Sequence, residues 1–290
     1  PVAGLVIIFG PRWVPESVSD SIPNKVDLIS VPLASLGVGI AILAITQGDK
    51  WGWTSFNLIL SFLIAFLLVT AFVIRSQRHS APLFDLGLFK LKTFSVGMIG
   101  TVFFMVAFFS WLISLPTFIQ SVWGWSVLKT GFAIAPAPLL TAFVSPPAGR
   151  LAERIGNGPI LTIGGFLGAT GLALHLAFTN SQPDYVMGIF IPGILIGFAA
   201  GFGFAQLIGA AMRDVPRDQF GMAGAGRTTI FQLSLALGVA LAFTIIGRPD
   251  SPQQALDGIQ TTWILGIGCY IAQILLFAFF GGSDKTQKVK

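Results

Sequence analysis

Long apolar stretches alternate with short polar segments along most of this chain. Eight stretches contain no Asp, Glu, Lys or Arg, and they cover residues 28–48, 51–74, 93–128, 130–149, 155–183, 185–212, 228–247 and 258–283. Because a helix needs about 20 mostly apolar residues to cross the hydrocarbon core of a bilayer, each stretch predicts one membrane-spanning helix. The third is too long for one span, so we expect its end, around Trp123 and Trp125, to form an interfacial loop.

The chain opens inside a further apolar run, at residues 2–9. This run lacks the basic start and the length of a secretory signal peptide. We therefore expect it to be the end of a membrane helix whose beginning lies outside this sequence, which would make the chain a fragment.

Composition supports a membrane protein and limits its chemistry. The 290 residues are 54% hydrophobic and 10% charged, whereas a soluble domain carries about 25% charged residues. The single cysteine, Cys269, excludes an intrachain disulfide and a cluster of thiolate metal ligands. The sequence therefore predicts an all-α integral membrane protein with no metal site and no cofactor.

The basic residues are distributed unevenly between alternate loops. Thirteen of the 17 Lys and Arg residues fall in one set of loops and the C-terminal tail, three (Lys50, Lys129 and Arg248) fall in the other set, and Arg227 falls at the edge of a span. Because Lys and Arg are enriched in short cytoplasmic loops, we expect the larger set and the C-terminus to be cytoplasmic. This distribution accounts for the net charge of +5 without a nucleic-acid partner.

Three glycines, Gly193, Gly197 and Gly201, recur at every fourth residue of the stretch 185–212. This spacing places them on one face of a helix, where they allow a neighbouring helix to approach closely. Two interpretations remain open: close packing alone, or packing at an interface that also slides during transport.

Several motifs together resemble one family of membrane proteins. The segment "AGRLAERIGNGP" (148–159) resembles the cytoplasmic signature of the major facilitator superfamily, through Gly149, Leu151, Ala152, Glu153, Arg154 and Gly156. The segments "PTFIQSVWGWSVLKTGFAIAP", "PLFDLGLFKLKTF", "VPES" and "FQLSLALGVA" resemble parts of its fourteen-span drug–proton antiporters. The chain is thus similar to the C-terminal portion of that family over nearly its whole length.

The resemblance implies a partial helix bundle of the major facilitator type, with the end of helix 6 and eight complete spans. Residues 1–14 would be the end of the truncated helix 6. Residues 15–92 would hold the two extra linker helices, 7 and 8, with cytoplasmic loops. Residues 93–290 would form the C-terminal six-helix bundle with a cytoplasmic tail, and the N-terminal half of the transporter would be missing.

The charged segment 148–159 would form a cytoplasmic gating loop according to the same resemblance. A carboxylate near a helix N-terminus is favourable by roughly 0.3–1 kcal/mol, so Glu153 could make such a contact in one state of a transport cycle and lose it in the other. The alternative is a solvated turn that follows the positive-inside rule. The predicted gating motif comprises Gly149, Arg150, Glu153, Arg154 and Gly156.

Arg227 is the one basic residue expected inside a span. It follows Phe220 by seven residues, which corresponds to a depth of about 10 Å. It would either extend its side chain to the interface or line a substrate cavity. The family often has an arginine directly before Gln-Leu, but Phe231 occupies that position here. The predicted cavity-lining set is Trp111, Gln120, Gln206, Arg227, Thr228 and Gln232.

No carboxylate lies near the middle of a predicted span. Proton-driven transporters use titratable groups inside the membrane, and the resemblance places those groups in the missing N-terminal half. His175 lies inside a span on a helix expected to be peripheral. Two interpretations remain open for it, a packed or interfacial histidine and a residue that carries protons.

These observations predict a secondary active transporter of the plasma membrane, a multi-pass protein of a bacterial inner membrane, that exports amphiphilic small molecules or drugs in exchange for protons. The alternatives are an exporter of a specific metabolite, such as an organic acid or a siderophore, and a non-transporting membrane protein. An enzyme is not expected, because the spans offer no cluster of acids, bases or metal ligands. The expected partners are a small-molecule substrate, protons, the lipid bilayer and the missing N-terminal half.

Overall fold

The computed structural model describes residues 27, 29–79 and 85–281, and all regular structure in this part of the chain is helical. The long elements are α2 (Ser30–Trp51), α3 (Phe56–Arg78), α4 (Lys92–Ser121), α5 (Val127–Ile134), α6 (Pro136–Ile155), α7 (Asn157–Phe178), α8 (Ile191–Met212), α9 (Phe220–Ile246) and α10 (Pro252–Phe280). Three short helical turns join them: η1 (Leu86–Lys90), η2 (Val186–Phe190) and η3 (Arg217–Gln219). The predicted end of helix 6 (1–14) and the C-terminal tail (282–290) lie outside the described residues.

All eight predicted spans are confirmed as helices long and apolar enough to cross a membrane, with α5 and α6 together forming one of them. A loop is present where the interfacial loop was predicted, because α4 ends at Ser121 and α5 begins at Val127. Two charge-free stretches begin later than their helices: α10 begins at Pro252 rather than at residue 258, and α9 begins at Phe220, the residue from which the depth of Arg227 was counted, rather than at residue 228. Both helices include a charged residue near one end, which a search for charge-free stretches cannot accommodate.

Local sequence explains where the helices begin and end. Ser55, Ser126 and Ser251 each accept a hydrogen bond from a backbone N–H in the first turn of the next helix, which satisfies a donor that the helix itself leaves unpaired. Gly52 and Gly156 end α2 and α6 with φ of +86° and +88°, a region that glycine enters without steric penalty.

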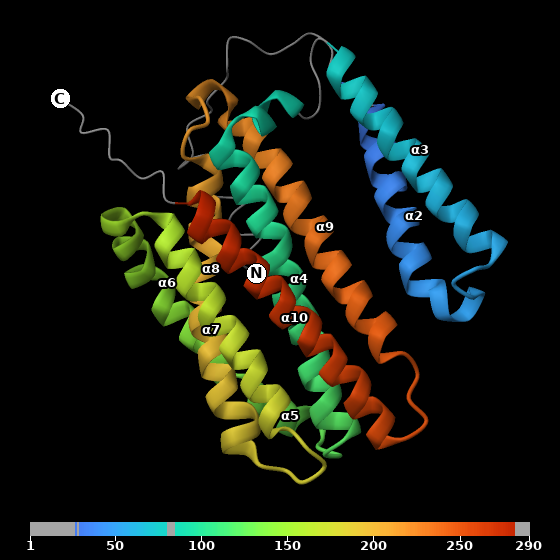
Figure 1. Cartoon of the computed structure of the whole chain (residues 1–290), viewed down its shortest axis with the longest axis vertical. Coiled ribbons are helices and arrows are strands. Elements are labelled where there is room, and N and C mark those ends of the chain that lie inside the picture. Colours follow the sequence, from blue (N-terminus) through green and yellow to red (C-terminus); the bar gives the residue numbers. More distant parts are fainter. Residues whose placement is uncertain (1–26, 28, 80–84, 282–290) are drawn as a thin grey trace, which may run out of the picture.

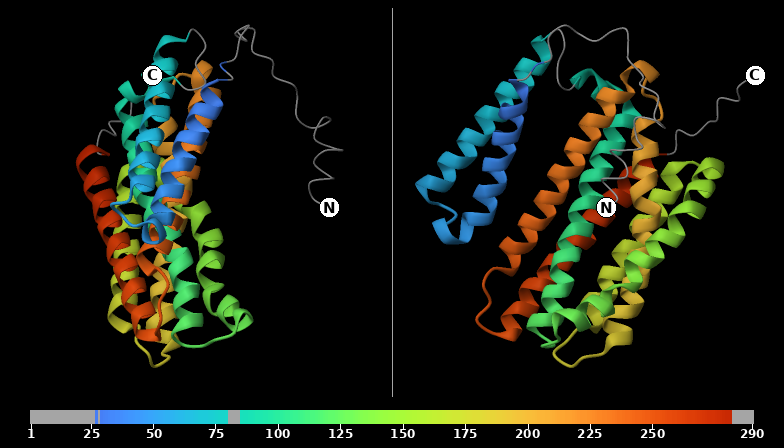
Figure 2. Two further views of the ribbon diagram at one scale, coloured as in Figure 1. Left: turned by 90° about the vertical axis from the view of Figure 1, so that its right-hand side faces the viewer. Right: turned by 180° about the vertical axis from the view of Figure 1, so that it is seen from behind.

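Helices α4–α10 form one bundle (Figure 1). Helix α4 packs against α8, α9 and α10, while α7 packs against α8 and α10, and α6 against α8. The helices α2 and α3 form an antiparallel hairpin beside this bundle, and α2 is the member that contacts α9 (Figures 1 and 2). Between them, the Thr244 hydroxyl donates a hydrogen bond of 3.1 Å to the Ile45 carbonyl.

The glycine strip on α8 packs closely against α6. A Cβ atom added to Gly197 would lie 2.7 Å from the carbonyl oxygen of Ala137, and one added to Gly201 would lie 2.7 Å from the Val144 side chain. Gly193 is less crowded, because its added Cβ would lie 3.9 Å from Ala137. The predicted close packing is therefore confirmed, and it is tightest toward the middle of α8.

The described basic residues separate between the two ends of the molecule. Most of them belong to the ends of α3 and α6, the start of α4 and the segment after α8, each of which lies at the upper end of its helix in Figure 1. Lys50 lies in the last turn of α2, Lys129 in α5 and Arg248 just after α9, and these three segments lie at the lower ends of their helices in Figure 1. The structure thus sorts these charges as the loop pattern predicted, while the identity of the cytoplasmic end stays a prediction.

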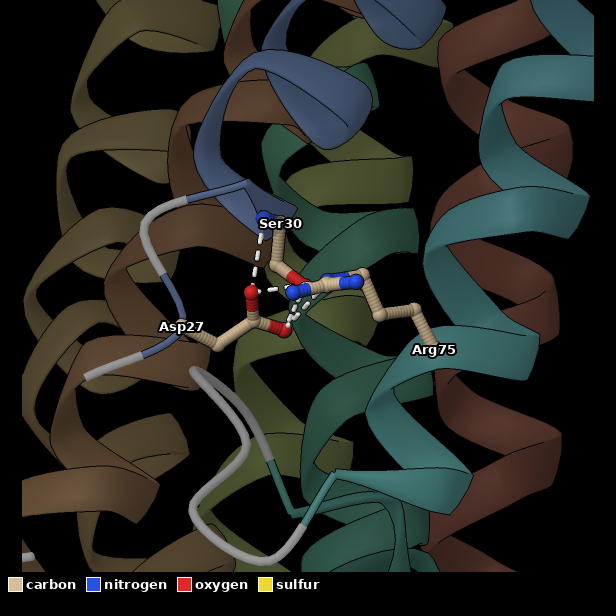
Figure 3. A network of polar contacts seen from close by, with 3 residues as sticks. All are labelled: Asp27, Ser30 and Arg75. Carbon is tan, nitrogen blue, oxygen red and sulfur yellow. Dashed lines mark hydrogen bonds and ion pairs between the residues drawn. The ribbon is translucent and has the colours of Figure 1, made fainter. Parts of the chain in front are cut away.

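An ion pair joins Asp27, which precedes α2, to Arg75 of α3 (Figure 3). The Nε atom of Arg75 donates to Asp27 at 2.8 Å, and both the backbone N–H and the hydroxyl of Ser30 also donate to this carboxylate. The Asp27 side chain is inaccessible to solvent. Its burial alone would raise the pKa, but the hydrogen bonds from Ser30 and Arg75 outweigh this effect and lower the pKa of Asp27 from 3.8 to about 2. No pattern in the sequence predicted this pair.

Candidate functional site

A cavity of about 180 Å³ lies between α4, α6 and α8, with Ile134 of α5 at its edge. Helix α4 provides much of the wall through residues at positions i, i+3, i+4, i+7 and i+8, which form one face of a helix. The lining residues are Phe108, Trp111, Leu112, Leu115, Pro116, Ile134, Ala137, Pro138, Thr141, Ile196, Gly197 and Phe204. The opposite wall is formed by α6 and α8, which approach each other closely at Gly197.

The cavity wall is almost entirely apolar. Of the lining residues, all of which the structure describes, two carry a polar side-chain atom, Trp111 and Thr141. The Thr141 hydroxyl lies 3.0 Å from the carbonyl oxygens of both Ala137 and Gly197. The Trp111 Nε1 atom donates to His175 at 3.1 Å. Because both polar groups already have partners, the wall is suited to apolar and aromatic groups rather than to charged ones.

Aromatic rings extend the wall toward α9. Phe204 meets both Phe104 and Phe108 edge-to-face, with ring centroids 5.2 Å apart in each pair. Phe231 of α9 follows at 6.5 Å from Phe204. The position at which the resembled family often has an arginine therefore carries a ring that continues this aromatic cluster.

His175 is completely buried inside the bundle. Its Nδ1 atom lies 2.8 Å from the Gly188 carbonyl oxygen, and its ring stacks on Trp263 with centroids 5.1 Å apart. Helix α7, which was expected to be peripheral, packs mainly against α8 and α10. Its His175 side chain nevertheless points into the bundle. The interpretation as a packed histidine is the one that this geometry supports.

The other five predicted cavity residues do not line this cavity. Gln206 is buried, and its Nε2 atom has no partner among the described residues. Gln120, Thr228 and Gln232 are exposed, and Arg227 is half-buried. The Gln120 amide donates to the Pro116 carbonyl and the Thr228 hydroxyl to the Gly224 carbonyl, both within their own helices. Their predicted role in a cavity that a second half would complete stays a prediction.

The predicted gating motif is helical rather than a loop. Helix α6 continues through Ile155, so Gly149, Arg150, Glu153 and Arg154 occupy its last turns, and Gly156 alone forms the break before α7. The prediction of a loop was wrong because Leu151, Ala152, Glu153 and Arg154 favour a helix and outweigh the single Gly149. Arg150, Glu153 and Arg154 are exposed, and within the described part of the chain none of the three forms an ion pair.

Metal chemistry has no support at this site. Among the described residues, no group of three or more His, Cys, Asp or Glu side chains could hold a metal ion. The arrangement offers apolar contact and aromatic surface, which is binding chemistry.

Eight membrane-length helices, three of which enclose an apolar cavity, define a helical membrane protein with an internal binding surface. The sequence model of the Major Facilitator Superfamily matches residues 28–239. The match covers well over half of the chain, which therefore belongs to this superfamily.

Several curated relatives carry names that refer to resistance or transport. The chain is 27% identical to the lincomycin resistance protein LmrB of Listeria monocytogenes, over 92% of this chain and 59% of that protein. It is 31% identical to the uncharacterized transporter YebQ of Escherichia coli, over 86% of this chain and 54% of that protein. It is 29% identical to the multidrug resistance protein Stp of Mycobacterium tuberculosis, over 85% of this chain and 44% of that protein. The chain spans about half the length of the curated relatives it matches.

Proposed function

We propose that this chain forms the C-terminal portion of a secondary active transporter that exports amphiphilic drugs or similar small molecules in exchange for protons. The observation that carries the proposal is the apolar cavity between α4, α6 and α8, whose two polar side chains are both hydrogen-bonded to other parts of the bundle. A wall of this kind favours the apolar part of an amphiphile through burial of its surface. Relatives named for lincomycin and multidrug resistance support the same substrate class.

The cavity chemistry argues against the specific exporter of an organic acid or a siderophore. Recognition of such a ligand requires charged or hydrogen-bonding groups at defined positions. The described lining residues offer no side chain of that kind with a free polar atom.

A second helix bundle would complete the cavity and carry the proton-coupling groups. The matched relatives are about twice as long as the matched segment, which leaves room for such a bundle. The exposed polar residues of α9, Thr228 and Gln232, and the half-buried Arg227 would face it. The motif at the end of α6 would act as a state-dependent contact, with Glu153 docking near a helix N-terminus in one state. The protein would reside in the plasma membrane of a bacterium with its C-terminus in the cytoplasm.

The proposal is tested with the full-length polypeptide that carries these 290 residues. Reconstituted protein should drive the export of a lipophilic cation, such as ethidium, when a proton gradient is imposed, and an organic acid such as citrate should not compete. Trp111→Ala should weaken ethidium binding by about tenfold or more, which corresponds to about 1.4 kcal/mol. Trp51→Ala, at the far end of α2, is the matched control and should bind normally. Citrate transport without ethidium transport would overturn the proposal.

A further inference from the structure

We propose that His175 is a positioning residue of the substrate site: it holds the Trp111 indole against the cavity and so determines which substrates fit. The inference rests on the proposed function, because it assigns the Trp111 wall to substrate. His175 itself does not line the cavity, so it acts only through its neighbour.

The hydrogen-bonding partners fix the state of the imidazole. Trp111 Nε1 can only donate, so the Nε2 atom of His175 accepts with its lone pair. The Gly188 carbonyl can only accept, so Nδ1 carries the hydrogen. The imidazole is therefore neutral with its hydrogen on Nδ1, and both nitrogens are in use. An additional proton on Nε2 would face the Trp111 N–H, so this arrangement suits a fixed support better than a proton carrier.

A second tryptophan fixes the imidazole from its face. Trp263 of α10 stacks on the His175 ring with an angle of 29° between the planes. Its Nε1 atom donates to the Ser114 hydroxyl at 2.9 Å, and that hydroxyl also lies 3.2 Å from the Trp111 carbonyl oxygen. Residues from α4, α7 and α10 and the Gly188 carbonyl thus hold one another in a closed set of contacts. The Trp111 indole is the member of this set that reaches the cavity.

Loss of the His175 acceptor would leave the Trp111 N–H unpaired inside an apolar site. A buried donor without a partner is costly, so the indole would turn toward another acceptor. Any such rotation changes the shape of a cavity of only about 180 Å³. We therefore expect altered discrimination between substrates of different size, rather than a uniform loss of binding.

The test is a double-mutant cycle in the full-length polypeptide. His175→Phe keeps a ring against Trp263 but removes both hydrogen bonds. It should change the ratio of the dissociation constants of a small and a large lipophilic cation, tetramethylphosphonium and tetraphenylphosphonium, by about tenfold. The same change made in a Trp111→Phe background should alter this ratio by less than about twofold, because the side chain to be positioned is absent. Equal effects in the two backgrounds, or an unchanged ratio, would overturn the proposal.

Two further measurements distinguish failure of this proposal from failure of the proposed function. The difference between the fluorescence spectra of the wild type and Trp111→Phe isolates the Trp111 emission, which should shift in His175→Phe even if neither cation binds. Absence of binding to the wild type would then count against the proposed function alone, while an unshifted Trp111 emission would count against the positioning role. If His175→Phe does not fold, His175→Gln serves instead, and it should preserve the size ratio better than His175→Ala.

Discussion

At the scale of single residues, three polar side chains support the packing of one helix against another. Trp111, Thr141 and Trp263 each direct a polar atom away from open space and toward a partner on another helix. The sequence predicted Trp111 as a cavity residue. It also favoured Gln120, Gln206 and Gln232, because polar residues inside apolar stretches are candidates for a cavity wall. The cavity found between α4, α6 and α8 is apolar. Apolar lining residues cannot be distinguished from packing residues without the positions of the helices, so the sequence could not identify them.

Thr141 provides a residue-scale test of an interhelical hydrogen bond. Thr141→Val keeps the shape and removes the hydroxyl that contacts Gly197 on α8. Such bonds contribute roughly 0.6 kcal/mol in membrane proteins, so unfolding in detergent should become easier by about that amount. Thr261→Val is the control, because the Thr261 hydroxyl contacts only the Asp257 carbonyl of its own helix. Equal destabilisation of the two variants would contradict the interhelical role.

The Asp27–Arg75 pair predicts a defined pH dependence. The folded pKa of Asp27, about 2, lies below its ordinary value of 3.8, so the ionised form stabilises the fold. This contribution is complete above about pH 4 and is lost as the pH falls toward 2. Hydrogen exchange at the start of α2, corrected for intrinsic rates, should therefore show equal protection at pH 5 and pH 7.

The matched variants for this prediction are Asp27→Asn and Asp214→Asn. Asp27→Asn should lower the protection at both pH values. Asp214 pairs with Arg213 at an exposed site, where an ion pair contributes little, so Asp214→Asn should have no effect. A wild type that loses protection between pH 7 and pH 5 would show that another titrating group controls this end of the hairpin.

At the scale of helices, the sequence predicted the number of membrane-spanning helices better than it predicted where each helix begins and ends. Each charge-free stretch contains one span, because the hydrocarbon core demands length and apolarity of every crossing helix. The charge-free stretches begin later than α9 and α10, since Arg227 and Asp257 lie within helices near their ends, although the depth expected for Arg227 already assumed a helix that starts at Phe220. The helical conformation of residues 149–155 was not predicted for a related reason. Charged residues indicate contact with water, but they do not exclude a helix.

The contact between α6 and α8 provides an element-scale prediction. Gly197→Ala would place a Cβ atom 2.7 Å from the Ala137 backbone oxygen. Because the Ala137 oxygen belongs to the backbone, this clash can be relieved only if α6 and α8 move apart. Overpacking of this kind costs about 1–3 kcal/mol, and the separation should also weaken binding in the adjoining cavity. Gly193→Ala is the control on the same face, because its Cβ would meet Ala137 at an ordinary 3.9 Å. Thermal unfolding of the two purified variants measures the difference, and similar melting temperatures would contradict this account of the helix contact.

At the scale of the whole molecule, the separation of charge between the two ends predicts a topology. Single cysteines would replace Lys50, Lys129, Arg78 and Arg154 in the full-length polypeptide, in a Cys269→Ala background. A membrane-impermeant maleimide added to intact cells should label positions 50 and 129, whereas positions 78 and 154 should react only after the membrane is opened. The physical reason is that Lys and Arg are enriched in short cytoplasmic loops. The structure places the segments with most of the basic residues at the same end of their helices. Labelling in the reverse pattern would show that the orientation in the membrane is opposite to the predicted one, and it would not contradict the helix bundle. External labelling of positions 129 and 154 together would contradict the bundle, because α5 and α6 form a single span between them.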